Sequence, residues 1–445
     1  MPAGFRFHGF YFPFVASVVL RWEFSKSEVM KYPLKCLALL FAVVAVSSAT
    51  VRAASFDWPQ WQGPDRSGAS QETGLLKTWP VGGPKRVWLF ENAGNGYSGP
   101  AIVNGKFFTL GTRAGSEILL ILDAGTGAEI LTAKLGGVLD NNWGDGPRGT
   151  PTVDSDRVYA LSGPGNLVCV SIAEGNILWQ ASLQSLGGQI PEWGYTESVL
   201  VDGPLVLCTP GGRKGAVAAL DKMTGKVLWQ SKAFTDAAHY SSIVPARINN
   251  TPQYVQRTEK SIVGIAADDG RLLWQTSFSG RIAVIPTPIV KGNEVYVTAG
   301  YGAGCKMVRI GPGNEVTTVY ENKTMKNHHG GVIQVGDFLY GHNDPAGWVC
   351  QNLQTGEEVW NHRAFGKGAV GYAEGMIYCV EEGSGTVVLA EASSKGWTEH
   401  GRFKLAPQTK IRRAQGRIWT HPVISNGRLY LRDQDLIYCY DIKAP

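Results

Sequence analysis

The feature that most constrains the fold is a short segment that recurs along the chain around a turn glycine. In its clearest copy, ALDKMTGKVLW from Ala219 to Trp229, β-prone runs flank a tight turn. Asp221 can hydrogen-bond back to the chain there, and Gly225 supplies a backbone angle that other residues resist. Each copy therefore predicts a β-hairpin. The seven copies centre on Gly127, Gly175, Gly225, Gly270, Gly313, Gly356 and Gly396.

Successive turn glycines lie about 40 to 50 residues apart, the period of propeller blades with four strands each. Two other positions repeat with the glycine. The position four residues later holds Trp179, Trp229, Trp274 and Trp360, with Leu131 and His400 in the first and seventh copies. The position six residues earlier holds mostly small residues: Ile121, Cys169, Ala219, Gly264, Met307, Cys350 and Ala390. We predict that the tryptophans dock each blade on its neighbour, where packing is crowded.

An eighth blade is divided between the two ends of the chain. The C-terminal run HPVISNGRLYLRDQDLIYCYDI predicts three strands, with Cys439 in the small-residue position. The missing fourth strand is predicted in KRVWLF, whose Trp88 completes the set of docking tryptophans. The sequence therefore predicts an all-β, eight-bladed propeller whose ring is closed by an N-terminal strand, leaving no open edge around the circle. Repeats of this kind pack against their neighbours, so we expect one domain over residues 54–445.

The first fifty residues do not belong to this pattern. Two lysines precede the eleven-residue apolar run at 36–46, and small residues follow up to Ala53, as in a secretory signal that is cleaved there. This signal, residues 30–53, begins naturally at Met30, so residues 1–29 are interpreted as a mis-assigned upstream start. The apolar run is too short to span a bilayer. We expect the mature chain to be periplasmic or otherwise exported, soluble and monomeric.

Charge and cysteine content exclude several classes of function. Without residues 1–53 the chain holds 36 Lys and Arg against 35 Asp and Glu, a balance that gives no reason to expect nucleic-acid binding. Six cysteines remain, and three of them, Cys169, Cys350 and Cys439, share the small-residue position, which favours buried thiols over a disulfide framework. No Walker loop, G-x-S-x-G or H-E-x-x-H motif is present, and no metal site is predicted.

Polar side chains gather where the first strand of each predicted blade begins. In a propeller this strand lines the central channel, so the segments before it face the channel mouth. The segments GYTESVLV, HYSSIV, HHGGVI and WTHPVI are examples, and PRGTPTV contributes an arginine. One interpretation is that these groups only satisfy backbone groups in a crowded channel. The other is a ligand-binding mouth with two charged members, Arg148 and Glu197. Its candidate residues are Arg148, Glu197, Tyr195, Tyr240, His328, His329, Trp419 and His421.

From about Trp58 to its C-terminus the chain resembles the PQQ-repeat, or quinoprotein-type, propeller family. The segment from Ala219 to Trp229 matches the docking pattern A-x-D-x-x-T-G-K-x-x-W of that family at every fixed position. The segments DWPQWQGPDRSG, WGYTESVLVDGPLVLCTPGG, NHHGGVI and WTHPVISNGRLYLRDQD resemble the stand-alone members labelled PQQ-binding-like. The outer-membrane barrel-assembly lipoprotein is similar in fold and carries no quinone, so the resemblance implies the propeller and leaves the cofactor open.

The dehydrogenases of that family imply features that this sequence can be checked for. They carry a vicinal cysteine disulfide over pyrroloquinoline quinone (PQQ), and no two cysteines are adjacent here. They bind calcium through a carboxylate and an asparagine beside a catalytic aspartate. Glu197 is a candidate for the carboxylate, but no matching Asn and Asp were found.

Three hypotheses of function follow from the sequence. The leading one is an exported, non-enzymatic binding or scaffold protein that presents its mouth to a protein or envelope ligand, with a role in envelope protein assembly. The alternative is a small PQQ- and calcium-dependent dehydrogenase of alcohols or sugars, in which the quinone performs the chemistry. The third is a polysaccharide-binding module, suggested by the aromatic residues near the strand starts.

Overall fold

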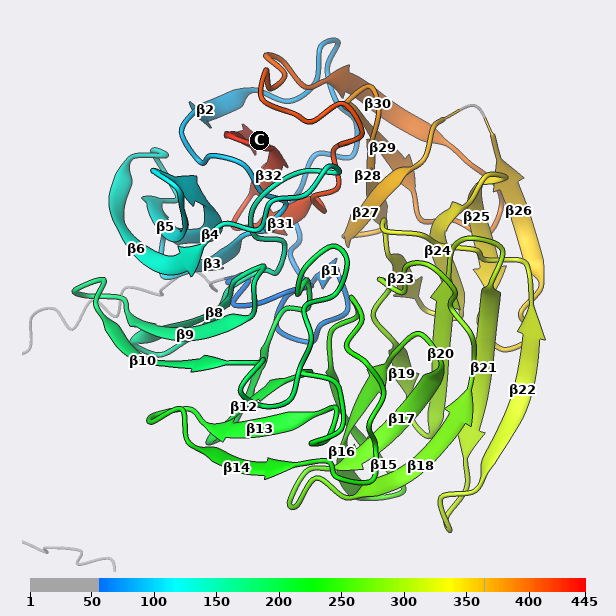
Figure 1. Cartoon of the computed structure of the whole chain (residues 1–445). Coiled ribbons are helices and arrows are strands. Elements are labelled where there is room, and N and C mark those ends of the chain that lie inside the picture. The colour runs from blue at the N-terminus through cyan, green and yellow to red at the C-terminus, as the bar shows by residue number, and fades with distance from the viewer. Residues whose placement is uncertain (1–55, 364) are drawn as a thin grey trace, which may run out of the picture. The chain divides into compact units, whose positions relative to one another are not determined.

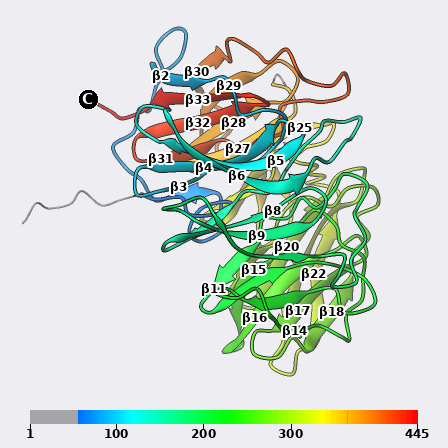
Figure 2. The same cartoon turned by 60° about the vertical axis from the view of Figure 1, so that its left-hand side comes forward.

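The computed structural model describes residues 56–363 and 365–445, and every regular element in this part of the chain is a β-strand. Eight sheets, each built on four antiparallel strands, follow one another around a central axis (Figure 1), and Figure 2 shows the same ring turned to one side. The predicted eight-bladed propeller is confirmed. The predicted start and signal segments, 1–29 and 30–53, lie outside the described residues. Residues 56–363 and 365–445 contain no helix long and apolar enough to cross a bilayer.

The first four blades each contain four consecutive strands. Blade 1 consists of β3 (Ala101–Val103), β4 (Lys106–Arg113), β5 (Ser116–Asp123) and β6 (Glu129–Gly137). Blade 2 consists of β7 (Thr152–Asp154), β8 (Arg157–Leu161), β9 (Asn166–Ser171) and β10 (Ile177–Ser182). Blade 3 consists of β11 (Leu200–Asp202), β12 (Leu205–Cys208), β13 (Ala218–Asp221) and β14 (Val227–Gln230). Blade 4 consists of β15 (Val244–Ile248), β16 (Thr251–Arg257), β17 (Ser261–Ala266) and β18 (Leu272–Ser277).

The last four blades include the two that use N-terminal strands. Blade 5 consists of β19 (Ile289–Lys291), β20 (Glu294–Ala299), β21 (Gly304–Ile310) and β22 (Val316–Asn322). Blade 6 consists of β23 (Val332–Val335), β24 (Phe338–Asn343), β25 (Gly347–Asn352) and β26 (Glu358–His362). Blade 7 consists of β27 (Gly368–Ala373), β28 (Met376–Glu381), β29 (Thr386–Glu391) and β30 (Glu399–Lys404), with β1 (Ala69–Ser70) added beside β27. Blade 8 consists of β31 (Val423–Ser425), β32 (Arg428–Asp433), β33 (Leu436–Asp441) and β2 (Arg86–Phe90).

The ring is closed where the sequence predicted. Strand β2 pairs antiparallel with β33, and Trp88 lies opposite Cys439 in that pairing. The N-terminal strand thus supplies the outer strand of a blade whose other three strands come from the C-terminus. The closed circle buries an edge of β33 that would otherwise be free to pair with another chain.

The repeated glycine and tryptophan meet between neighbouring blades. A Cβ atom added to Gly225 would lie 2.6 Å from a ring carbon of Trp179, so only glycine leaves room for that indole. Trp179 Nε1 also donates a hydrogen bond to the carbonyl of Lys222, three residues before the glycine (2.9 Å). Trp88 and Trp360 donate in the same way to the carbonyls three residues before Gly127 and Gly396. These three indoles therefore donate a hydrogen bond to the next blade. The other two docking tryptophans differ, because Trp229 Nε1 has no hydrogen bond and Trp274 Nε1 donates to Gln253 of its own blade.

In two blades, residues other than the repeated tryptophan make the contact with the next blade. In blade 5 the hairpin is longer, so Tyr320 takes the place opposite Met307 and donates its hydroxyl hydrogen to the carbonyl of Leu353. In blade 7 the β-bulge falls at His400, and Ala390 pairs with Glu399 instead. The buried indole of Trp79, from the chain before β2, packs there against Phe403.

A segment that precedes all eight blades crosses the channel. This axial segment, residues 56–70, forms two backbone hydrogen bonds through Trp58 to Ile102 and ends as β1, parallel to β27. Figure 1 shows β1 near the centre of the ring, away from the outer strands. The segment touches every blade or the chain just before it, through Ile102, Val153, Val199, Ile243, Thr287, Ile333, Tyr372 and Ser425.

One buried cation holds the axial segment in place. The guanidinium of Arg66, which is only 3% exposed, donates from Nη1 to the carbonyl of Ile243 (2.7 Å) and from Nη2 to those of Ser198 (3.1 Å) and Val199 (2.6 Å). Its Nε donates to Gln60 within the same segment. Three of these four hydrogen bonds satisfy buried backbone carbonyls of the neighbouring blades.

Candidate functional site

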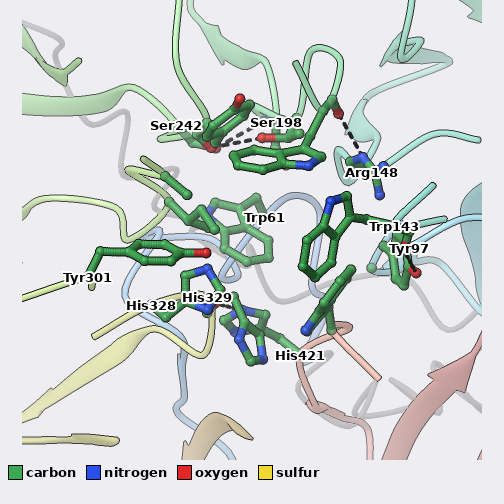
Figure 3. Close-up of a pocket in the computed structure, with 17 residues that line it drawn as sticks. Trp61, Tyr97, Trp143, Arg148, Ser198, Ser242, Tyr301, His328, His329 and His421 are labelled. Atoms are coloured by element: carbon green, nitrogen blue, oxygen red, sulfur yellow. Dashed lines mark hydrogen bonds between the residues drawn. The ribbon is translucent and has the colours of Figure 1, made fainter. Parts of the chain in front are cut away.

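A cavity of about 160 Å³ occupies the channel mouth above the axial segment. We call it the axial cup. Its wall comes from the segments that precede the first strands of the blades, together with loops that rise beside them (Figure 3). The residues that line it are Trp61, Tyr97, Gly99, Trp143, Arg148, Trp193, Thr196, Ser198, Tyr240, Ser242, Ala283, Ile285, Tyr301, His328, His329, Trp419 and His421.

The wall of the cup is mainly aromatic. Tyr97 packs on Trp419, with ring centroids 5.0 Å apart, and Trp193 packs on Tyr240 at 5.4 Å. Trp143 and Tyr301 approach from opposite sides in Figure 3 and are the most exposed aromatic members, at 42% and 40%. These two side chains therefore mark the rim, while the other rings line the depth of the cup.

Trp61 forms the floor. Its Nε1 donates to Thr287 Oγ1 (2.9 Å), and its ring meets that of His421 edge to face at 4.7 Å. The same indole also lines a second, much smaller cavity, together with Trp58 and Gly68 of the axial segment. The axial segment therefore borders both spaces.

Arg148 is the cation in the wall. Its Nε donates to the carbonyl of Trp193 and its Nη2 to that of Gly144, both at 2.7 Å. The guanidinium carbon also lies 5.0 Å from the centroid of the Tyr97 ring, within cation–π range. Burial lowers the pKa of Arg148 from its ordinary value. Nη1 forms none of the hydrogen bonds found among the described residues, so it remains a donor for a ligand.

Three imidazoles form the wall opposite Arg148, and they are uncharged at neutral pH. Burial lowers the pKa values of His328 and His421 to about 4, and it lowers the pKa of His329 well below its ordinary value. His421 Nε2 donates to the backbone carbonyl of His329 (2.9 Å), which fixes its tautomer.

Two of these imidazoles contain nitrogen atoms that lack partners among the described residues. His328 Nδ1 and both ring nitrogens of His329 are buried without a hydrogen bond. His329 Nδ1 lies 3.3 Å from Glu382 Oε2, which accepts a hydrogen bond from Trp419 Nε1 (2.9 Å). The neutral imidazole forms no ion pair with this carboxylate, and no hydrogen bond joins the two atoms. Buried polar atoms in folded proteins are normally paired, so these nitrogens call for a ligand or water in the cup.

The structure brings six of the eight candidate residues together in the cup: Arg148, Tyr240, His328, His329, Trp419 and His421. Tyr195 and Glu197 do not line it. The ring of Tyr195 lies in the core between blades 2 and 3, where its hydroxyl donates to the carbonyl of Pro210 (3.1 Å). The carboxylate of Glu197 turns away from the mouth and accepts from the Thr209 backbone and from Gln256.

The alternation of side chains explains this division. Glu197 lies between Thr196 and Ser198, which both face the cup, so its own side chain points to the opposite side of an extended segment. Burial raises the pKa of Glu197 to about 7. Arg148 and Glu197, predicted as the charged members of one mouth, share no hydrogen bond or ion pair among those of the described residues.

Five aromatic members of the cup are not among the eight candidates: Trp61, Tyr97, Trp143, Trp193 and Tyr301. Trp143 and Trp193 carry a signal that the sequence did offer, because each precedes a glycine in the loop leading to a first strand, NNWGDGPRG and PEWGYTE. Trp61 lies outside the repeat, and Tyr301 lies in a turn between β20 and β21. Neither has a counterpart in the other blades that would have identified it.

The donor set of the cup does not fit calcium. None of its lining residues is a carboxylate, and the described residues contain no group of three or more His, Cys, Asp or Glu side chains arranged to hold a metal ion. Hard cations such as calcium require several oxygen ligands, carboxylates above all. The six cysteines of the described residues are all free and buried, so none forms a disulfide over the cup.

Comparison with known proteins identifies relatives for this propeller. Residues 114–362 match the family model described as outer membrane protein assembly factor BamB. A curated protein of that name from Moranella endobia (strain PCIT) is 24% identical over 177 residues, which are 40% of this chain. The match covers 41% of that relative, so this chain spans less than half of its length.

Solved structures share the fold at low sequence identity. BamB from Moraxella catarrhalis superposes with a TM-score of 0.56 at 15% identity, over 81% of this chain and 98% of that one. The quinohemoprotein alcohol dehydrogenase from Comamonas testosteroni superposes with a TM-score of 0.61 at 11% identity, over 89% of this chain and 82% of that one. At these identities the likeness concerns the propeller fold alone.

Proposed function

The chain belongs to the family described as outer membrane protein assembly factor BamB, and from this premise we propose that it is an exported, non-enzymatic binding protein of the cell envelope. In this proposal the axial cup is the binding site and the ring of blades is the rigid scaffold around it. The observation that carries the proposal is the cup itself, an aromatic-walled cavity lined by one guanidinium and no carboxylate. Such sites combine apolar surface with a few placed polar groups.

The arrangement of polar groups in the cup favours binding over catalysis. A hydroxyl nucleophile needs a general base within hydrogen-bonding reach. Ser198 and Ser242 line the cup, but their hydroxyl oxygens accept from the backbone N–H groups of Thr150 and Ser198. No hydrogen bond among the described residues joins either hydroxyl to an imidazole. The cup therefore offers recognition groups without a nucleophile–base pair.

The likeness in fold to a quinohemoprotein alcohol dehydrogenase favours the alternative, a PQQ- and calcium-dependent dehydrogenase. Two properties of the cup speak against it. Its volume of about 160 Å³ is close to the roughly 150 Å³ of a cavity that holds one benzene ring, which is small for three fused rings. Its donor set also lacks the carboxylates that calcium requires.

Envelope protein assembly is the specific role that the relatives' name suggests. The match covers less than half of the curated relative, so this role is a proposal for the present chain. A scaffold in such a process needs a rigid ring with an accessible mouth, and the closure of blade 8 by β2 supports that rigidity.

Site-directed crosslinking in cells tests whether the mouth engages an envelope component. A photoreactive benzoylphenylalanine placed at Trp143, on the rim, should form adducts in the envelope fraction. The matched control places the same group at Leu228 on the outer strand β14, where the side chain is 52% exposed. Adducts from Leu228 without adducts from Trp143 would contradict the mouth as the binding face.

Mass spectrometry of the same purified protein should also show a mature N-terminus near Ala53.

A further inference from the structure

We propose that the ligand of the axial cup is a single acidic sugar ring, a uronic acid residue, held by aromatic stacking, one guanidinium and neutral imidazoles. The inference rests on the proposed function, because it names the ligand class of that binding site. Three observations support the inference: the size and apolar wall of the cup, the positive charge in that wall, and the unpaired polar atoms around the cup.

The cup has room for one six-membered ring. Its volume is about 160 Å³, and a cavity of roughly 150 Å³ accommodates benzene. Trp61, Trp419 and Tyr301 line this space, and Figure 3 shows the hydroxyl end of Tyr301 pointing into it. A pyranose presents a face of C–H groups that packs on aromatic rings, while its hydroxyls point outward toward the walls. Both a sugar and an aromatic ring satisfy this first requirement.

Arg148 selects for a negative charge. Its Nη1 is free to donate, and its other donors are fixed by the carbonyls of Trp193 and Gly144, so the guanidinium is held in place before a ligand arrives. No carboxylate lines the cup, although Glu117 and Asp145, which do not line it, interact favourably with the charge of Arg148. A carboxylate on the ligand can accept a charge-assisted hydrogen bond from Nη1, whereas the guanidinium would repel a cationic ligand.

The unpaired imidazole nitrogens select for hydroxyl groups. His329 is 6% exposed, and both of its ring nitrogens lack a partner, as does His328 Nδ1. A neutral imidazole provides one donor and one acceptor, the pair that a hydroxyl group satisfies. Ser198 and Ser242 add two hydroxyls to the wall. Several polar atoms around one ring match a sugar better than the aromatic side chain of a peptide, which would leave these nitrogens unpaired.

The test is isothermal titration calorimetry of the full mature chain with four small probes. Methyl β-D-glucuronide represents a chain end of a polysaccharide and D-glucuronate the free acid. D-glucose provides the same ring without the charge, and N-acetyl-L-tyrosine represents a peptide end. We expect a uronic acid to bind about ten- to a hundredfold more tightly than glucose, the range for a hydrogen bond to a charged group. Tighter binding of the methyl glycoside than of the free acid would identify a polysaccharide as the source.

Two variants locate the effect. Arg148→Gln should remove the preference for glucuronide over glucose, and near-UV circular dichroism should show that the fold is kept. Tyr301→Ala, on the exposed rim, should weaken binding of both sugars by about tenfold or more, whereas Met223→Ala, on a distant exposed hairpin, should leave binding unchanged. The inference is overturned if N-acetyl-L-tyrosine binds more tightly than glucuronide, if glucose binds as well, or if none of the probes binds. Adducts at the rim together with absent sugar binding would reject the sugar and keep the proposed function.

Discussion

Substitution of Arg66 tests whether one buried cation fixes the segment that floors the cup. In Arg66→Ala, the carbonyls of Ser198 and Ile243 lose a hydrogen bond that no other donor among the described residues supplies. The carbonyl of Val199 keeps a second donor, the hydroxyl of Thr152 at 2.6 Å. Each stranded buried acceptor costs about 1–3 kcal/mol, so two carbonyls account for roughly 2–6 kcal/mol.

Removal of the buried charge offsets part of this loss. Burial lowers the pKa of Arg66 to about 9, which shows that the fold disfavours the charge although it remains protonated at pH 7. Taking a charge out of a buried site recovers part of its desolvation cost. We therefore expect a net loss of about 3 kcal/mol in the free energy of unfolding.

The assay is guanidinium chloride unfolding followed by tryptophan fluorescence, in which a loss of stability lowers the denaturation midpoint. The control is Arg213→Ala, which removes the same charge from an exposed loop and should change stability by no more than about 0.5 kcal/mol. The denaturation midpoint of Arg66→Lys should lie between those of Arg66→Ala and Arg213→Ala, because one ammonium group cannot reach all of the carbonyls that the guanidinium contacts. Equal midpoints for Arg66→Ala and Arg213→Ala would refute the role of Arg66 as the anchor of the axial segment.

Three further outcomes are expected. Trp179→Ala should lower the free energy of unfolding by about 3 kcal/mol or more. Trp179→Leu should lower it by clearly less, because blade 1 makes the same contact with Leu131, and equal losses for the two variants would contradict the docking contact. Burial raises the pKa of Glu197 from 4.5 to about 7. Between these two pH values the folded chain keeps a proton that the unfolded chain has released, so the stability that this carboxyl contributes is lost as the pH rises through 7. Relative to Glu197→Gln, the wild type should therefore lose up to about 3 kcal/mol between pH 4.5 and 8, and parallel pH profiles would show that the carboxyl is not perturbed. A chain that begins at Asn92 lacks β2 and the axial segment and should aggregate through the exposed edge of β33; a stable monomer on size-exclusion chromatography would mean that the ring closes without them.

The propeller was predictable because its signal is local and repeated. A glycine turn recurs with each of the seven hairpins, and a tryptophan follows it four residues later in four of them, so even weak copies support one another. The prediction was less complete where two blades depart from the repeat. The longer hairpin of blade 5 replaces the tryptophan with Tyr320, and blade 7 shifts its bulge to His400. Both changes depend on hairpin length and strand register, which the glycine spacing alone does not determine.

The candidate site was predictable as far as it follows the blades. Residues just before the first strands reach the channel mouth, and six of the eight candidates lie there. The direction of each side chain is set by strand alternation, which turned Glu197 away from the cup and into the blade. Trp61 could not be predicted by this route, because its position depends on a segment that precedes the repeats and is fixed by contacts with every blade.

A titration with PQQ and calcium tests the central claim, that the axial cup is a binding site without quinone chemistry. Increasing PQQ, with calcium in excess, is added to the purified mature chain, and the quinone's absorbance and the tryptophan fluorescence are followed together. The four tryptophans in the cup wall make fluorescence a direct report on its occupancy. The account predicts no saturable change and no alcohol-dependent reduction of a dye. Stoichiometric binding of PQQ with quenching of the cup tryptophans, followed by dye reduction with an alcohol or sugar, would contradict it.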